Sequence, residues 1–122
     1  MSDLQALEGL TAKAVFTGVH ARSVRGERVT LAVVELDPGA LVPEHRHEPE
    51  QLGVLIEGSL DFRVGEERRM LGPGDTWRIV RDTPHEVRAG AEGAILVEAF
   101  SPAREDWAGL EDAPPRPIRW PR

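Results

Sequence analysis

Two of the four histidines stand one residue apart in the stretch Pro43-Glu-His-Arg-His-Glu-Pro-Glu-Gln-Leu-Gly-Val-Leu-Ile-Glu-Gly58. An extended strand projects alternate side chains to one face, so His45, His47 and Gln51 are expected to point the same way. Glu50 has the opposite parity unless a bulge intervenes, which favours Gln51 over its neighbour. Imidazole nitrogens and amide oxygens suit divalent first-row metals. The stretch therefore predicts half of a metal site.

The composition limits the classes of function. The chain has 122 residues, the size of one domain with a single core, and its net charge of −6 argues against nucleic acid as a partner. No cysteine is present, which excludes disulfides, thiolate metal sites and cysteine nucleophiles. The sequence has no apolar run long enough for a membrane span, and residues 1–10 do not resemble a signal peptide. We therefore expect a cytoplasmic protein with no membrane partner.

Turn-forming residues divide the middle of the chain into short segments rich in Val, Thr and Phe. Arg25-Gly26-Glu27 predicts a hairpin turn, and Asp37-Pro38-Gly39 and Gly72-Pro73-Gly74-Asp75 predict two further turns. About ten short strands without a convincing internal helix indicate an antiparallel all-β sandwich or barrel. The expected strands cover residues 14–24, 28–36, 41–47, 50–56, 60–64, 68–71, 76–80, 85–88 and 94–100, with a turn at 90–93.

Three regions are expected along the chain. Residues 1–12 form an N-terminal arm with a short helical turn, and residues 13–104 form the β-barrel. Residues 105–122 form a Pro-rich C-terminal surface segment, because the run 113–117 cannot be regular helix or central strand. This segment is too apolar for a solvated tail, so it should lie across its own barrel or across a partner subunit. Its apolar residues are Trp107, Leu110, Ile118 and Trp120.

The spacing of these residues resembles the two-motif signature of the cupin superfamily of small β-barrels. The first motif is present as Gly39, five residues, His45-x-His47, three residues, Gln51, six residues and Gly58, with Gln51 where the family has an acidic residue. The second motif is present as Gly74, ten residues and His85. It is degenerate, since Val80, Asp82 and Ala89 replace the expected proline, glycine and asparagine.

The resemblance covers roughly residues 29–104 and implies the cupin double-stranded β-helix, a jelly-roll barrel. It also implies one divalent transition metal ion (Mn, Fe, Ni or Zn) bound by His45, His47, Gln51 and His85. A neutral amide in place of a carboxylate leaves more of the cation's charge uncompensated, which makes the ion a stronger Lewis acid. The alternative is that the histidines merely line a polar barrel mouth. The remaining histidine, His20, is expected at the surface or in a subunit contact.

A narrower resemblance links two segments, His45-Arg-His47-Glu-Pro-Glu-Gln51 and Glu98-Ala-Phe100-Ser-Pro-Ala-Arg104-Glu-Asp. They are similar to the pectin-degradation cupins, which convert a cyclic unsaturated uronate into its linear keto form. In that subgroup the residues matching Glu98, Phe100 and Arg104 line the pocket facing the metal. The subgroup has aspartate where this chain has Glu98, and the extra methylene puts the identity of the substrate in doubt.

The pattern of the last strand supports a pocket role independently. Leu96, Glu98 and Phe100 share one face of it. A carboxylate between two apolar residues is partly desolvated, so its pKa should rise toward the range of a general acid or base. Arg104 can pair with a substrate carboxylate. The alternative is a structural ion pair between Arg104 and Glu98 that closes the barrel end.

These residues favour a metal-dependent enzyme of the isomerase or lyase type, acting on a small oxygenated metabolite such as a sugar acid. Ring opening of unsaturated uronates is the most specific form of this hypothesis. Glu98 and Arg104 would be catalytic, and Phe100 and Arg104 would bind substrate. Two alternatives are an iron-dependent dioxygenase and a non-catalytic module that binds a small molecule or a metal. The expected partners are a small-molecule substrate and a second copy of the chain in a homodimer.

Overall fold

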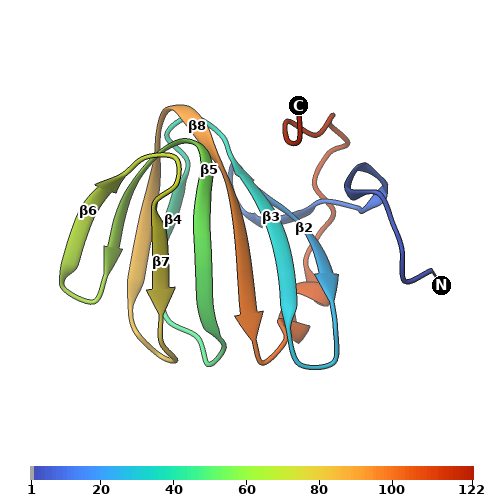
Figure 1. Cartoon of the computed structure of the whole chain (residues 1–122), viewed down its shortest axis with the longest axis horizontal. Coiled ribbons are helices and arrows are strands. Elements are labelled where there is room, and N and C mark those ends of the chain that lie inside the picture. The colour runs from blue at the N-terminus through green and yellow to red at the C-terminus, as the bar shows by residue number, and fades with distance from the viewer. Residues whose placement is uncertain (1) are drawn as a thin grey trace.

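The computed structural model describes residues 2–122 and is built almost entirely from β-strands (Figure 1). This confirms the predicted all-β class. Two short 3-10 helices flank the strands, η1 (Leu7–Gly9) and η2 (Glu105–Gly109). The strands are β1 (Lys13–Phe16), β2 (Val19–Arg25), β3 (Thr30–Leu36), β4 (Leu41–His45), β5 (Glu50–Val64), β6 (Glu67–Leu71), β7 (Thr76–Ile79) and β8 (His85–Ser101).

Two long strands, β5 and β8, organise the barrel. They pair antiparallel with each other, and each contributes one half to each of two facing layers. One layer has the order β1, β2, β3, second half of β8, first half of β5 and β7. The other consists of β4, the first half of β8, the second half of β5 and β6. This arrangement is the predicted jelly-roll barrel, and all its strand pairs are antiparallel.

Both long strands bend where the sequence predicted breaks. We expected a strand end near Glu57–Gly58 and a turn over 90–93, but β5 and β8 continue through both positions. Gly58 has a φ of 87°, and a Cβ there would lie 2.0 Å from the Gly93 carbonyl oxygen. Residues 90–93 lie opposite the single residue Ser59. Close approach of the two backbones therefore bends the strand pair without ending it.

Two other boundaries differ from the prediction. The expected strand over 14–24 is divided at Gly18, which has a φ of 75° and turns the chain between β1 and β2. The expected strand over 41–47 ends at His45, because the pairing of β4 with β8 becomes irregular between Val42 and His45. As a result His47 lies in the connection to β5.

The core fills the space between the two layers with side chains from their facing surfaces. Its most deeply buried members include Leu36, Leu55 and Leu60, each no more than 1% exposed. Burying a Leu side chain contributes roughly 1.5–3 kcal/mol. The core does not fill the barrel completely, and the remaining space forms the cavity described below.

The C-terminal segment lies on its own barrel. After η2, the Ala14 N–H donates to the Glu111 carbonyl at 2.9 Å, and the Ala113 N–H donates to the Ala12 carbonyl at 2.8 Å. Further along, the Arg22 guanidinium donates to the Arg116 carbonyl on the outer face of β2. Residues beyond β8 therefore extend the first layer and then cover part of its outside. Among residues 2–122, no helix is long and apolar enough to cross a membrane.

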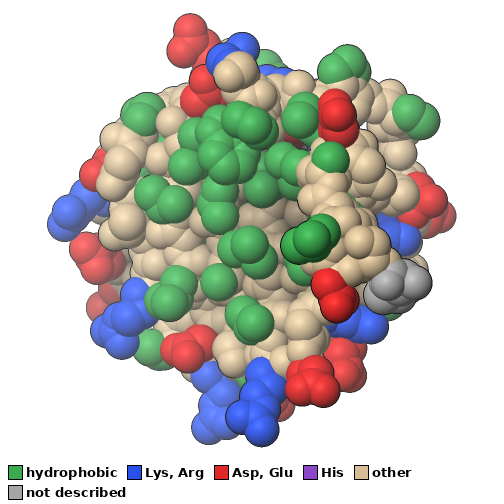
Figure 2. Space-filling model, turned by 45° about the vertical axis from the view of Figure 1, so that its right-hand side comes forward, with side chains coloured by type: hydrophobic (Ala, Val, Ile, Leu, Met, Phe, Trp, Pro, Cys, Tyr) green, Lys and Arg blue, Asp and Glu red, His purple; other side chains and the backbone are tan. Residues whose placement is uncertain are grey.

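Part of the outer face of this layer is uncovered and apolar. Val24, Leu31 and Leu52 are 56%, 50% and 48% exposed. The strand register places Val24 beside Leu31, while Leu31 and Leu52 both pair with Ala99, so the four residues form one row across β2, β3, β8 and β5. We call them the outer apolar row. Figure 2 shows hydrophobic side chains over the middle of one side of the molecule, with charged side chains mainly around its edge.

Candidate metal centre and pocket

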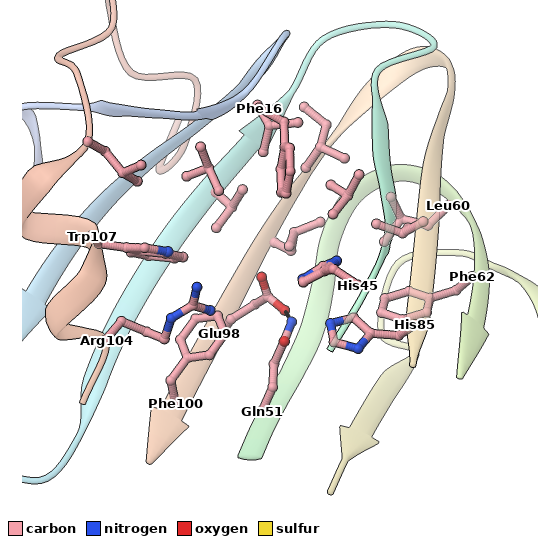
Figure 3. A pocket seen from close by; sticks show the side chains of 18 of the residues that line it. Phe16, His45, Gln51, Leu60, Phe62, His85, Glu98, Phe100, Arg104 and Trp107 are labelled. Carbon is pink, nitrogen blue, oxygen red and sulfur yellow. Dashed lines mark hydrogen bonds between the residues drawn. The ribbon is translucent and has the colours of Figure 1, made fainter. Parts of the chain in front are cut away.

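Three histidines converge inside the barrel. His45 ends β4, His85 begins β8 opposite it in the strand register, and His47 follows in the connecting loop. One ring nitrogen from each lies within 4.8 Å of the others. Figure 3 shows the rings of His45 and His85 beside Gln51 and Glu98. The sequence predicted that His45 and His47 would converge along one strand; they converge instead because β4 ends and the chain bends.

Each imidazole is oriented by a hydrogen bond from its Nδ1 to a backbone carbonyl two residues away. His45 contacts the Pro43 carbonyl at 2.8 Å, His47 the Pro49 carbonyl at 2.7 Å, and His85 the Thr83 carbonyl at 2.8 Å. A ring that donates from Nδ1 carries its lone pair on Nε2. The three backbone contacts therefore fix the ring orientation that metal-ligating histidines require.

Gln51 is the fourth candidate ligand, and its side chain is oriented by Glu98. Gln51 is buried at 7% exposure whereas Glu50 is exposed, as strand parity predicted. The Gln51 amide nitrogen donates to Glu98 Oε2 in a short hydrogen bond, which leaves the amide oxygen 3.1 Å from His47 Nε2. Since Nε2 of His47 also presents a lone pair, this contact brings two acceptors together. A cation between them would relieve the repulsion.

The buried nitrogens favour a neutral, metal-accepting state. Nε2 of His85 is buried with no hydrogen-bond partner. Burial lowers the pKa of His85 to about 4, and burial also lowers the pKa of His47. Both rings are therefore neutral near pH 7 and free to bind a cation. The four side chains fit one divalent transition metal ion of the kind that prefers nitrogen and oxygen ligands.

Glu98 is held in place from two sides. In addition to Gln51, the Trp77 indole N–H donates to Glu98 Oε2 at 3.0 Å. Gly53, on the strand between them, gives the indole its space, because a Cβ there would lie 2.2 Å from the Trp77 ring. Burial raises the pKa of Glu98 to about 7, although both hydrogen bonds and the charge of Arg104 oppose the increase. Such a carboxyl can release and accept a proton near neutral pH.

Arg104 lies between two aromatic rings at the edge of the same cavity. Its guanidinium carbon is 4.9 Å from the Phe100 ring centroid and 4.8 Å from that of Trp107. Nε and Nη2 donate to the two carboxylate oxygens of Asp106 at 3.0 and 2.9 Å. Its ion-pair partner is thus Asp106, and the predicted alternative of a structural pair with Glu98 is not formed within residues 2–122.

The cavity has a volume of about 230 Å³. It lies between the two layers, and the candidate residues His45, Gln51, His85, Glu98, Phe100 and Arg104 all line it (Figure 3). His47 is not among the residues that line the cavity. His20 lies apart from it on β2, where its largely buried ring is 3.6 Å from Asp37 Oδ2.

Trp77, Gly53 and Asp106 belong to the site but were not predicted. Gly53 carried a usable signal, since glycine inside an apolar strand often marks a close approach of another group. Trp77 lies in the neighbouring strand, and the sequence offered no measure of the register between them. Asp106 is two residues from Arg104, and no pattern indicated that the chain folds back there.

Comparison with known proteins identifies the class. The model of the cupin domain matches residues 32–100, more than half of the chain, and the protein belongs to the cupin family. The chain is 31% identical over 78 residues to the pectin degradation protein KdgF of Dickeya dadantii (strain 3937), covering 63% of this chain and 71% of that protein.

Solved structures support the same fold. An RmlC-like cupin from Shewanella frigidimarina NCIMB 400 aligns with a TM-score of 0.80 at 23% identity, covering 87% of this chain and 96% of that chain. KdgF from Halomonas sp. aligns with a TM-score of 0.78 at 24% identity, covering 87% and 98% respectively.

Proposed function

We propose that this cupin is a metal-dependent enzyme of the isomerase or lyase type that acts on a small oxygenated carboxylic acid. Ring opening of an unsaturated uronate is the specific reaction we propose to test first. The observation that carries the proposal is the buried Glu98 carboxyl, which lies against the candidate ligand Gln51 and has a pKa near 7. Similarity to a pectin degradation protein supports the substrate class.

A metal bound by His45, His47, Gln51 and His85 would act as a Lewis acid on adjacent substrate oxygens. Glu98 takes the proton from the anomeric hydroxyl, which is on the carbon that also carries the ring oxygen. The ring C–O bond then breaks, which leaves an aldehyde and an enolate. Return of the proton to the enolate carbon gives the linear keto form, so the reaction is an isomerisation in which no atom is gained or lost.

Arg104 binds the substrate carboxylate in this proposal. Asp106 occupies Nε and one edge of Nη2, so Nη1 remains available for a second carboxylate. The stacking on Phe100 and Trp107 restricts the guanidinium, which lowers the entropy lost on binding. Phe100 also covers the side of the cavity next to Glu98.

The test is turnover of a cyclic unsaturated uronate by the metal-loaded protein, followed by loss of absorbance from the conjugated double bond. Glu98→Gln should lower turnover by about 10²- to 10⁴-fold, since general acid–base catalysis contributes on that scale. Glu50→Gln is the matched control, because Glu50 is exposed on the neighbouring strand β5, and this variant should turn over normally. Unchanged turnover in Glu98→Gln would exclude the proton-transfer role, and no turnover by the metal-loaded protein would exclude an unsaturated uronate as the substrate.

We also propose that the protein forms a homodimer through the outer apolar row. A contiguous apolar surface with three half-exposed aliphatic side chains is unfavourable in water and fits a second copy of itself about a two-fold axis. The double variant Leu31→Asp/Leu52→Asp should sediment as a monomer at concentrations where the parent protein is dimeric. Met70→Asp is the control, because Met70 is 65% exposed on β6, outside the row.

A further inference from the structure

The cavity is strongly divided in its chemistry. Thirteen of the nineteen side chains that line it are aliphatic or aromatic. The six others are the imidazoles of His45 and His85, together with Gln51, Glu98, Arg104 and Asp106. Among these lining residues, all of which the structure describes, there is no Ser, Thr, Asn, Tyr or Lys. The cavity therefore offers few groups that could hydrogen-bond a hydroxylated ligand.

Most polar groups that are present already have partners. The Gln51 amide nitrogen is used by Glu98, and Glu98 Oε2 accepts from both Gln51 and Trp77. Arg104 donates through two of its nitrogens to Asp106. The remaining capacity consists of the imidazole Nε2 atoms, one Glu98 oxygen, the Nη1 edge of Arg104 and the indole N–H of Trp107, which lies beside Arg104. A ligand can satisfy its oxygens only against this group.

The available polar groups lie at one end of the cavity. Figure 3 shows His45, Gln51, His85, Glu98 and Arg104 close together, with aliphatic side chains and the ring of Phe16 farther along. The lining residues Phe16, Val42 and Leu110 are partly exposed, so the rim on that side is apolar as well. A ligand whose head meets the polar end places its body against hydrocarbon.

The physical consequence is selection against hydroxyl groups on the body of the ligand. A hydroxyl that is buried without a hydrogen-bond partner weakens binding by roughly 5- to 100-fold. A hydrocarbon group in the same place gains affinity from the apolar surface that it buries. A dry cavity of about 150 Å³ is sufficient for a benzene ring. The 230 Å³ present here has room for a small chelating head and about one ring.

We propose that the substrate is an amphipathic carboxylic acid, with a second oxygen beside the carboxylate and an aromatic or branched aliphatic body. The head lies between the His45–His85 pair and Arg104, and the body lies along Phe16, Leu60 and Trp107. The inference rests on the proposed function for the position of the carboxylate and its neighbouring oxygen. It narrows the substrate class by specifying the rest of the molecule as apolar. It favours a lightly hydroxylated acid over a fully hydroxylated sugar acid.

The experiment is calorimetric titration of the metal-loaded protein with three acids. Pyruvate carries only the head, phenylpyruvate adds an aromatic body, and galacturonate carries a hydroxylated body. Phenylpyruvate should bind at least about tenfold more tightly than either of the others, given the hydrocarbon surface it buries. Equal binding of pyruvate and phenylpyruvate, or tighter binding of galacturonate, would overturn the inference.

The same titration separates this inference from the proposed function. Tighter binding of galacturonate would exclude a substrate with an apolar body. It would remain consistent with the proposed function, in which the substrate is an oxygenated acid. If none of the three acids binds, with or without metal, the inference fails, while turnover of the unsaturated uronate tests the proposed function separately. If phenylpyruvate binds equally well to the metal-free protein, the oriented head described here is wrong.

A pair of nearly isosteric variants tests the body region directly. Val34→Thr and Val87→Thr each place a hydroxyl in the apolar wall. Each should weaken phenylpyruvate binding at least about fivefold and leave pyruvate binding unchanged. Val80→Thr is the control, since Val80 is 44% exposed and does not line the cavity. Circular dichroism of each variant confirms that it is folded, and unchanged phenylpyruvate binding by both folded wall variants would overturn the inference.

Discussion

Two buried ionisable clusters lie on opposite faces of the same β-layer, and they are balanced in different ways. On the outer face, Arg22 and Glu35 lie 3.5 Å apart with side chains 8% and 3% exposed. The C-terminal segment closes over them, because Arg22 donates to the Arg116 carbonyl and the Arg119 N–H donates to Glu35. The chain itself therefore pairs the two charges of the outer cluster, although Nε of Arg22 and Oε1 of Glu35 are buried without a hydrogen-bond partner.

The inner cluster is not balanced in this way. Glu98 is contacted by the neutral donors of Gln51 and Trp77, and one ring nitrogen of each nearby imidazole lies within 4.8 Å of the others. The only charged side chain among the lining residues that could oppose Glu98 is Arg104, which is paired with Asp106. The comparison indicates that a balanced cluster serves stability, whereas an unbalanced one is suited to bind a cation and a ligand.

The largest expected effect is on the outer cluster. Glu35→Leu should lower the free energy of unfolding by about 3–5 kcal/mol, because it leaves the Arg22 charge buried without its partner. Urea unfolding measures the loss. The double variant Arg22→Met/Glu35→Leu should recover most of it, since removing both charges also removes the desolvation penalty. If the double variant is as unstable as the single one, the loss arises from packing and the outer cluster is not an ion pair in this sense.

The next effect is the pH dependence that Glu98 imposes on the metal-free protein. The folded chain keeps this carboxyl protonated up to about pH 7, whereas the unfolded chain loses the proton near the ordinary value of 4.5. The folded state thus binds more protons in this window, so stability falls as pH rises through it. The stability of the parent protein relative to Glu98→Gln should decrease by roughly 3 kcal/mol between pH 4.5 and 7.

His85 acts in the opposite direction within the same pH range. The pKa of His85 is lowered to about 4 in the folded protein. The stability associated with its neutral ring is therefore lost as pH falls from about 6.5 toward 4. Comparison with Glu98→Gln cancels this contribution because both proteins retain His85. Urea unfolding at each pH in the presence of a chelator provides the data. A relative stability that is constant across the range would show that Glu98 is ionised in the folded state at acidic pH.

A somewhat smaller effect is expected for metal affinity. His85→Ala removes one of the three candidate imidazole ligands and should weaken binding of a divalent transition metal by at least about 100-fold. Substituting a residue that only hydrogen-bonds a ligand already weakens metal binding by up to about 100-fold. Competition with a chromogenic chelator measures the affinity. His20→Asn is the control histidine, because His20 lies outside the triad. Equal affinity in His85→Ala and the parent protein would mean that the triad does not hold the ion.

The smallest effect is expected at Trp77. Trp77→Phe removes one hydrogen bond to Glu98 and keeps an aromatic ring beside Gly53. Turnover should fall by about fivefold, the equivalent of a neutral hydrogen bond of about 1 kcal/mol. Trp120→Phe provides the matched control. A loss as large as that of Glu98→Gln would mean that Trp77 does more than position the carboxyl.

The parts of the site that depend on local spacing were predictable from the sequence. Strand parity distinguished Gln51 from Glu50, and it placed Glu98 on the inner face of the last strand. The parts that depend on where strands end or bend were not predictable. His47 reaches the triad from a loop, and Arg104 pairs with Asp106 instead of Glu98. The first outcome depends on the pairing of β4 with β8, and the second on how Arg104 packs between Phe100 and Trp107. Neither is encoded in the periodicity of one sequence.

The fold as a whole followed the prediction, with one systematic difference. Glycine and proline marked turns correctly at 37–39 and 72–75, where the chain reverses. The same residue types at Gly58 and Gly93 marked bends inside continuous strands. The difference is physical, because at these bends the two backbones pass so closely that a side chain has no space. A single sequence does not distinguish this requirement from that of a turn.

The bend at 90–93 also sets the phase of the strand. Before it, the odd-numbered residues His85 and Val87 face the cavity; after it, the even-numbered residues Leu96 and Glu98 do. The bend thus acts as a half-period shift that brings the imidazole of His85 and the carboxyl of Glu98 to the same side of one strand. Deleting one residue there would rotate the second half of the strand by half a turn relative to the first, while deleting two would keep the phase. The number of residues in this bend therefore determines which side chains of the two strand halves face the same cavity.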